Sequence, residues 1–302
     1  MNELYKVIGV SKQAVNQYQK RQFIFDKNVS VLVSEAELLR KEHPGCGVEK
    51  MYYTLKPKFI GRDRFIDLFM EIGFRVKKKK NYRRTTYSSS MYYPNLIKGM
   101  EIRAPSIIWQ TDITYIYILA ENKFYYAVFI IDVYTKKIVG WQVSDNMRAT
   151  ANVKAFKMAL KDNKAPEIHH SDRGSQYIYK EYIKLLERNE CRISMSLIAQ
   201  ENAYAERINR TIKEEYLDYW KPKTFKELKR YMPKAVNHYN SKRPHNNIGR
   251  ISPIDFEKKV LDLPQQERPK VIIYTDVETN IEEASSLSNA EQELALAHNN
   301  PI

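Results

Sequence analysis

The sequence changes character at about residue 106, and this change most limits what the chain can fold into. Three runs, 107–119, 123–133 and 137–143, are rich in Ile, Val, Tyr, Phe and Trp, which favour β-strands. Glu121-Asn122 and Thr135-Lys136 separate them and suit hairpin turns. Helix-like and strand-like segments then alternate to about residue 219. We therefore predict an α/β domain in which an antiparallel meander begins a mixed five-stranded sheet with flanking helices.

The alternating part has clear boundaries in the sequence. It consists of a helix at 149–162, a strand near Ile168, a helix at 175–189, a short strand at 192–195 and a helix from about 201 to 219. On the last helix, the apolar residues Ala205, Ile208 and Ile212 form a stripe that should face the sheet. We expect the whole core domain to span residues 106–221.

The residues before the core predict small all-α modules. Gly9 can turn the chain and Ser11 can cap a helix, so residues 1–24 suit a short helix-turn-helix, with a plain helical hairpin as the alternative. A helix at 29–42 should end at His43-Pro44-Gly45. Helices at 47–55 and from 61 to Gly73 follow. We expect residues 25–86 to form a helical DNA-binding segment.

Charge is distributed unevenly along the chain. The formal net charge is +14, and the six acidic residues after Val271 are accompanied by no Lys or Arg, so residues 1–270 carry +20. Seven of the ten residues 75–84 are basic. A body this basic favours a polyanion such as DNA, although a basic surface on an unrelated soluble protein is the alternative. The basic run suits phosphate contact, or else a solvated linker.

The remaining segments predict connections rather than further domains. Residues 87–105, with many Ser, Tyr and Pro residues, suit a linker; 222–262 suit a C-terminal helical extension; 263–302 suit an acidic, disordered tail. The two cysteines lack metal-type spacing, which favours a reducing compartment. No apolar run is long enough to span a membrane. We expect a cytoplasmic, nucleoid-associated protein with no membrane partner.

Three acidic residues stand where a sheet could bring them together. Asp112 lies within the first predicted strand, Asp172 follows the strand near Ile168, and Glu206 lies on the helix after the last strand. Taken singly, each is more often a helix cap, a hydrogen-bonded structural acid or a member of an ion pair. Together they would converge at one edge of the sheet. Converging carboxylates suit Mg²⁺ or Mn²⁺, and two such ions can serve phosphodiester chemistry.

The order of these acids resembles the Asp-Asp-Glu core of retroviral integrases and related transposases, which has an RNase H-like fold. Local motifs are similar to those of transposases of the insertion-sequence "three" family, in its larger reading frame or fused product. They are Trp109-x-x-Asp112-x-Thr114, Ile131-Asp132 with Thr135 to Trp141, His170-Ser171-Asp172-Arg173-Gly174-Ser175-Gln176-Tyr177, Asn202-Ala203-x-Ala205-Glu206 and Tyr239-Asn240-x-x-Arg243-Pro244-His245. The match covers residues 30–260, with a slightly shorter spacer between Asp172 and Glu206.

The resemblance implies a DDE transposase, a polynucleotidyl transferase that cleaves one strand at the element's ends and joins the freed 3′-hydroxyl to another phosphodiester. It implies a circular intermediate, double-stranded DNA partners (terminal inverted repeats and target) and at least a homodimer on DNA. Asp112, Asp172 and Glu206 would hold two Mg²⁺ or Mn²⁺ ions. Asp132 is a weaker candidate for a fourth ligand.

The candidate DNA contacts come from the basic segments and from the predicted catalytic helix and strand. His170 and Asp172 should share a strand face, and Lys213 should share the helical face of Glu206. The full candidate set is His170, Lys213, Arg210, Arg62, Arg64, Lys77, Lys78, Lys79, Lys80, Arg83, Arg84 and Arg243.

Two other functions remain open at this stage. A catalytically silent DNA-binding regulator derived from a transposase would not need the three acids. An RNase H-like nuclease that cuts without joining would not need the helical modules ahead of the core. Both alternatives retain the same fold.

Overall fold

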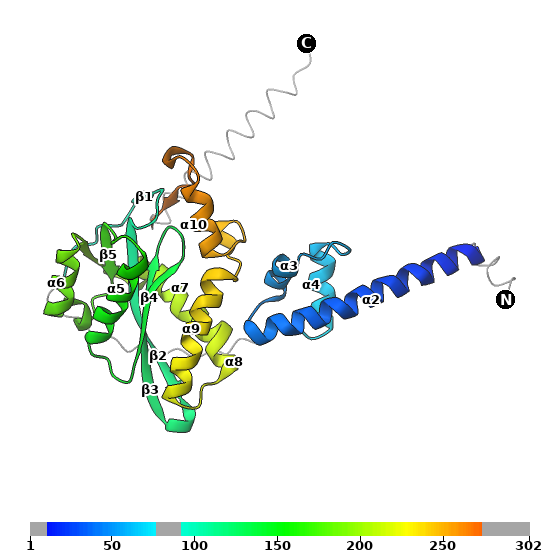
Figure 1. Ribbon diagram of the computed structural model, residues 1–302, viewed down its shortest axis with the longest axis horizontal. Coiled ribbons are helices and arrows are strands. Elements are labelled where there is room, and N and C mark those ends of the chain that lie inside the picture. The colour runs from blue at the N-terminus through cyan, green and yellow to red at the C-terminus, as the bar shows by residue number, and fades with distance from the viewer. Residues whose placement is uncertain (1–10, 77–91, 274–302) are drawn as a thin grey trace, which may run out of the picture. The chain divides into compact units, whose positions relative to one another are not determined.

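The computed structural model describes residues 11–76 and 92–273, and Figure 1 shows their helices and strands. Contacts divide these residues into two compact units. The helical unit takes in residues 11–76, 118–123 and 210–255. The sheet unit takes in residues 92–117, 124–209 and 256–273.

The sheet unit is built on a five-stranded sheet with the order β4-β3-β2-β5-β6. Its strands are β2 (Ile108–Ile118), β3 (Lys123–Asp132), β4 (Ile138–Ser144), β5 (Ile168–Ser171) and β6 (Arg192–Met195). β3 and β4 pair antiparallel, whereas β5 is parallel to both β2 and β6. This mixed sheet confirms the predicted fold class, including the succession of three strands followed by alternating helices and strands.

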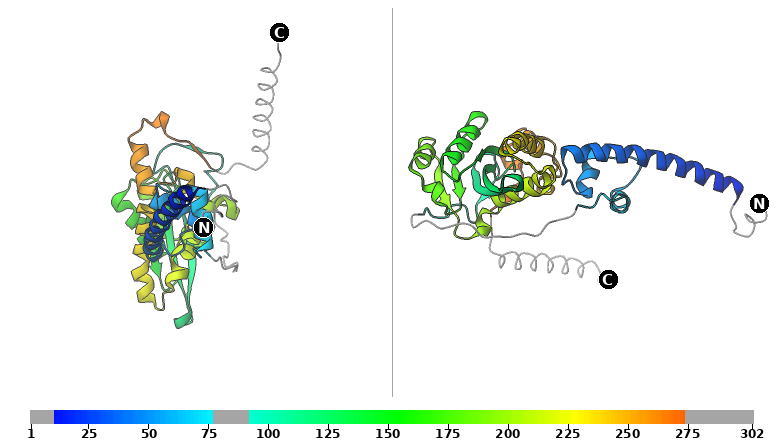
Figure 2. Two further views of the ribbon diagram at one scale, coloured as in Figure 1. Left: turned by 90° about the vertical axis from the view of Figure 1, so that its right-hand side faces the viewer. Right: turned by 90° about the horizontal axis from the view of Figure 1, so that it is seen from below.

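The two faces of the sheet are covered by different helices. Trp109 on β2 packs in one core with α5 (Thr150–Asp162) and α6 (Lys180–Arg188), which lie side by side in Figures 1 and 2. Because strand side chains alternate, the next residues that share a face, Gln110 and Asp112, point to the opposite side. There they contact α7 (Ala203–Ile212). The sheet therefore separates an apolar core from the side that carries the polar candidates.

The stretch predicted as a linker is attached to the sheet unit where the structure describes it. Ile97 and Ile102 are buried, and the Leu96 amide donates to the Ser194 hydroxyl. β1 (Glu101–Ile102) pairs antiparallel with β7 (Val271–Ile272). The extended backbone was predicted, but its burial was not, because the contacting partners are distant in sequence.

The helical unit contains a longer helix than the sequence predicted. α2 runs without a break from Lys12 to Glu42, where a separate helix at 29–42 was expected. No Gly or Pro interrupts residues 12–42, so nothing in the backbone stops the helix. Ser11 caps it as predicted, its hydroxyl accepting from the Ala14 amide at 3.1 Å. The first half of the predicted helix-turn-helix lies outside the described residues.

α3 (Val48–Leu55) and α4 (Arg62–Glu71) pack on the second half of α2. The Phe65 and Phe69 rings stack in the middle of this small core, with their centroids 4.1 Å apart. Gly73 follows α4 with φ +105°, a backbone conformation that favours glycine. A helical region therefore precedes the sheet unit in the sequence, as expected.

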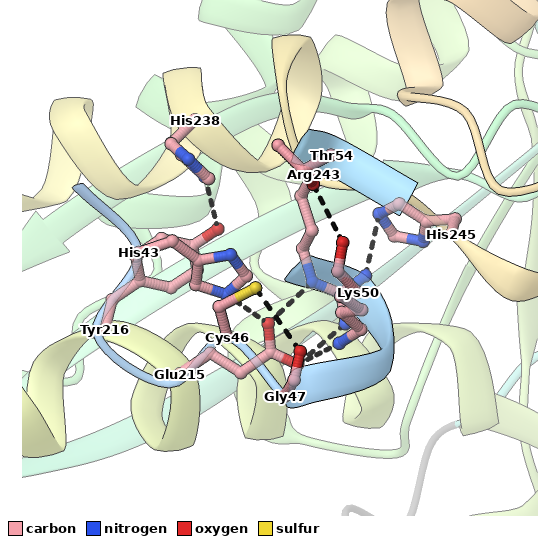
Figure 3. Close-up of polar contacts among 10 residues, drawn as sticks. All are labelled: His43, Cys46, Gly47, Lys50, Thr54, Glu215, Tyr216, His238, Arg243 and His245. Atoms are coloured by element: carbon pink, nitrogen blue, oxygen red, sulfur yellow. Dashed lines mark hydrogen bonds and ion pairs between the residues drawn. The ribbon is translucent and has the colours of Figure 1, made fainter. Parts of the chain in front are cut away.

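The other helices of this unit are a π-helical segment (Lys213–Leu217) that continues α7, α8 (Asp218–Trp220) and α9 (Phe225–Ser241); α10 (Pro253–Leu261) follows. Figure 3 shows a polar cluster around Glu215 in the π-helical segment. The Glu215 carboxylate accepts from Arg243 through two nitrogens at 2.7 Å, from Lys50 at 2.6 Å and from His43 at 2.6 Å. The cluster ties residues 43–50 to the π-helical segment.

Backbone contact reinforces this junction. The Gly45 amide donates to the Glu215 carbonyl at 2.6 Å, and a Cβ on Gly45 would lie 2.2 Å from the Glu215 Cα. Only a residue without a side chain allows this approach. Gly45 is therefore required by packing as well as by the end of α2.

We expect Gly45→Ala to lower the free energy of unfolding of the helical unit by roughly 2–3 kcal/mol, as overpacking against rigid backbone does. Gly47→Ala is the matched control, since a Cβ there meets nothing within 4 Å. Urea unfolding of both variants measures the difference. Equal losses in the two variants would mean that the Gly45 contact is unimportant.

Candidate active site

Asp112 and Asp172 lie side by side because their strands are parallel neighbours. Thr111 on β2 is in register with Ser171 on β5, and each aspartate is the next residue along the chain. The Asp112 carboxylate accepts from the Ile113 amide at 2.8 Å and from the Asn209 side-chain amide at 2.7 Å. Asp172 accepts from the Gly174 amide at 3.0 Å, which fixes the turn after β5. Both aspartates are partly buried.

The electrostatics of this pair differ from those of surface carboxylates. Burial raises the pKa of Asp112 to about 7, and repulsion from Asp172 and Glu206 adds to the shift. Burial also raises the pKa of Asp172. Asp112 accepts from two amide N–H groups, which lower its pKa but carry no full positive charge. A cation between the carboxylates would relieve this repulsion.

Glu206 lies in the first turn of α7 and is partly buried. It is four residues after Asn202 and three before Asn209, so these three side chains share one face of the helix. Asn202 donates to the Thr111 carbonyl at 3.0 Å, and Asn209 donates to Asp112. Glu206 thus belongs to the helical face that meets Asp112, and it contributes to the raised pKa there.

Asp112, Asp172 and Glu206 lie on the same side of the sheet but do not form a ready-made metal site. Within residues 11–76 and 92–273, no group of three His, Cys, Asp or Glu side chains is close enough to hold a metal ion as it stands. The Asp112–Asp172 pair is adjacent, while Glu206 reaches it from another element. Binding of one cation by all three acids would need their carboxylates to come closer together than they are.

Asp132, the weaker ligand candidate, has a different environment. Its carboxylate accepts from the Ser106 amide at 2.6 Å, and from the Thr135 amide at 2.7 Å and hydroxyl at 2.9 Å. These bonds close the turn between β3 and β4 and bury the side chain. The geometry therefore indicates a structural role for Asp132.

His170 is fully buried, and its Nδ1 lies 2.8 Å from the Ser194 hydroxyl on β6. Burial lowers its pKa to about 4, so the ring is neutral at pH 7. A neutral, fully buried ring suits bracing the sheet beside Asp172 better than contact with a phosphate.

The basic candidates are found in several environments. Arg62 and Arg64 are exposed at the start of α4, where Arg62 pairs with Asp63 and Arg64 lies over the Phe25 ring at 4.5 Å. Arg210 is exposed and Lys213 partly buried. Lys77, Lys78, Lys79, Lys80, Arg83 and Arg84 lie outside the described residues, as does most of the predicted acidic tail.

The environment of Arg243 contradicts the prediction that it contacts DNA. It is buried, and its guanidinium donates to Glu215 through two nitrogens and contacts the His245 ring through the third. A side chain committed in this way has little surface left for a phosphate. The sequence revealed its charge but not its partner, which lies 28 residues away.

The sequence indicated no role for Asn202, Asn209 or Gln110. Gln110 is fully buried, and its side chain contacts the start of α7. No local signal could have shown this, because the contacting residues are more than 90 positions apart.

In the described part of the chain, no helix is both long and apolar enough to cross a membrane.

Comparison with known proteins agrees with this arrangement. Two family models, both described as integrase core domain, match residues 103–199 and 191–253. A 31 kDa protein of insertion element IS600 from Shigella sonnei is 34% identical, covering 66% of this chain and 76% of its own length.

Two named transposases are also similar to the chain. The transposase of IS904 from Lactococcus lactis is 35% identical over 60% of this chain and 72% of its own. InsF, the transposase of IS3A from Escherichia coli, is 30% identical over 63% of this chain and 68% of its own. The integrase core, the adjacent aspartates and these relatives agree: the chain belongs to the insertion-sequence "three" family of DNA transposases, which are DDE polynucleotidyl transferases.

Proposed function

We propose that Asp112, Asp172 and Glu206 are the catalytic acids with which this transposase cleaves and joins DNA strands at the ends of its own element. The observation that carries the assignment is the Asp112–Asp172 pair on neighbouring parallel strands, with the pKa of Asp112 raised to about 7. A structural role would pair such acids with cations or protonate them. An active site instead leaves them available to a ligand.

The donor set suits a hard divalent cation, because carboxylate oxygens are the ligands that Mg²⁺ and Mn²⁺ prefer. Asp112, Asp172 and Glu206 would together hold the ions. When bound, the ions would supply charge neutralisation at the scissile phosphate and activation of the attacking oxygen. The mutual repulsion of the acids supports this fit, since it is what a cation would relieve.

The chain's own residues would perform the positioning. Asn209 holds the Asp112 carboxylate at 2.7 Å, and the Gly174 amide holds Asp172. The attacking group would be water in the cleavage step and the freed 3′-hydroxyl of the DNA in the joining step. In-line displacement needs no covalent bond to the protein, and joining one end to the other would give a circular intermediate.

We further propose double-stranded DNA as the partner, through the terminal inverted repeats and the target. The net positive charge of the chain supports this partner. Arg62, Arg64 and Arg210 are the described candidates whose side chains are exposed, and they would contact phosphates. Two ends must be held together for joining, so at least a homodimer would act.

The test is a cleavage and joining assay on labelled DNA from both flanks of the gene, with Mg²⁺ or EDTA. Nicking and joined products that require Mg²⁺, and that fall at least about a thousandfold in Glu206→Gln, are expected for loss of a catalytic ligand. Cleavage without joined product would favour the nuclease. Binding without metal-dependent chemistry would favour the silent regulator.

A further inference from the structure

A 3₁₀ turn (Ala199–Asn202) leads directly into α7. Asn202, the last residue of this turn, does not cap α7 through its side chain. Its side-chain amide donates to the Thr111 carbonyl at 3.0 Å, and its side-chain oxygen accepts no hydrogen bond within the described residues. The first amides of an α-helix have no partner within it, so a group from another element can bind them.

Gln110 supplies that group from the middle of the sheet. Its side-chain oxygen accepts from the Tyr204 amide at 3.1 Å and from the Ala205 amide at 3.4 Å. Its side-chain nitrogen donates to the Glu201 carbonyl at 3.2 Å. Gln110 is fully buried, so water does not compete for these bonds.

Three successive residues of β2 thus engage one helix face. Gln110 binds the first turn through its side chain, Thr111 binds Asn202 through its carbonyl, and Asp112 binds Asn209 through its carboxylate. These contacts fix both the rotation of α7 and its position along the strand. Glu206 lies between the contacts made by Asn202 and Asn209, on the same face.

We propose that Gln110 is a positioning residue of the active site, which caps α7 from the sheet and thereby sets the distance of Glu206 from the two aspartates. The inference rests on the proposed function, because it presumes that the acids bind a metal. A second contact also holds the first turn of α7 in place. The buried Lys136 ammonium lies 3.9 Å from the centre of the Tyr204 ring.

Mn²⁺ affinity measured by electron paramagnetic resonance tests this placement without requiring DNA or turnover. Gln110→Met preserves bulk and removes all three hydrogen bonds. We expect its dissociation constant for the Asp112-dependent Mn²⁺ site to rise about 10-fold, the usual effect of losing a residue that orients a ligand. Amide exchange at Tyr204 and Ala205 should accelerate in the same variant, which reports loss of the cap itself.

Gln142→Met on β4 is the matched control, since the Gln142 side chain bonds only to the Val143 carbonyl at 2.9 Å. Its Mn²⁺ affinity should stay within about twofold of the natural value. Gln110→Glu retains an oxygen for the two amides and should give an intermediate affinity. If Gln110→Met fails to fold, Gln110→Glu is compared with the natural protein instead. An Mn²⁺ affinity of Gln110→Glu equal to that of the natural protein would then overturn the proposal.

Other outcomes separate the two levels of inference. If the natural protein binds Mn²⁺ and joins element ends while Gln110→Met has unchanged affinity, the role of Gln110 is wrong and the proposed function stands. An equal loss in Gln142→Met would also overturn the proposal, because the effect would then be general. If Asp112→Asn leaves Mn²⁺ binding intact, the assignment of the acids fails and this inference fails with it.

Discussion

Asp112→Asn is expected to remove cleavage and joining while making the metal-free protein more stable. Loss of the carboxylate should lower the rate at least about a thousandfold, because one of the acids that would hold the metal is removed. The two Asp112 oxygens accept separately from the Ile113 and Asn209 amides, whereas the new side chain has only one oxygen, so one of these hydrogen bonds is lost and the other persists. A drop in activity accompanied by a gain in stability is the signature of a functional acid rather than a structural one.

The stability gain follows from the sign of the pKa shift. The folded pKa of Asp112 is raised to about 7, so ionised Asp112 destabilises the folded state. This penalty is absent well below pH 4, grows as the pH rises toward 7 and is complete above it. Raising the pKa from 3.8 to about 7 corresponds to about 4 kcal/mol, at about 1.4 kcal/mol per pKa unit. The lost hydrogen bond offsets roughly 1–3 kcal/mol of this gain. We therefore expect Asp112→Asn to gain on the order of 2 kcal/mol at pH 8 and to lose stability near pH 4.

Urea unfolding in EDTA at several pH values measures this gain. Asp145→Asn is the control, since Asp145 is exposed in the same unit. Added Mg²⁺ should stabilise only the natural protein, which narrows or reverses the difference. Destabilisation of Asp112→Asn at pH 8 would indicate that Asp112 is structural.

Arg243→Met should be among the most destabilising substitutions in the helical unit. It leaves the largely buried Glu215 carboxylate without its two-nitrogen partner, while Lys50 and His43 remain. Breaking a buried pair from one side costs roughly 3–5 kcal/mol. Lys242→Met removes the neighbouring but exposed Lys242–Glu42 pair and should cost no more than about 0.5 kcal/mol.

The pH dependence separates lost charge pairing from lost packing. Burial alone would raise the pKa of Glu215, but hydrogen bonds from Arg243 and His43 outweigh it and hold the pKa far below its usual range. Because the folded pKa is depressed, the stabilisation is fully present above the unfolded value of about 4.3 and is lost as the pH falls below it.

The difference between natural protein and Arg243→Met should therefore shrink as the pH falls below about 4.3. Urea unfolding at pH 7 and near pH 3 gives both values. Glu215→Gln introduced into Arg243→Met should recover part of the loss, because it removes the uncompensated charge. A loss that is independent of pH and not recovered would assign the effect to packing alone.

The order of strands and helices in the sheet unit and the end of α2 at His43 could be predicted from the sequence alone, and the three acids could be proposed from it. These features depend on local patterns: side-chain periodicity, helix-stopping residues and acids placed after apolar strands. The family motifs narrowed the function, since they combine several such patterns. The continuity of α2 was not predicted. The polar residues between its two apolar stretches suggested a break, but polar residues do not by themselves end a helix.

Which polar side chains contact one another became visible only in the folded structure. Gln110 accepts from a helix amide 94 residues away, and Glu215 binds Arg243, Lys50 and His43 from distant segments. Asp132 accepts hydrogen bonds within the turn between β3 and β4. Hydrogen bonding and ion pairing act over about 3 Å in space with no fixed separation along the chain. A residue's charge is therefore visible in the sequence, whereas its partner, and hence its role, depends on how the chain folds.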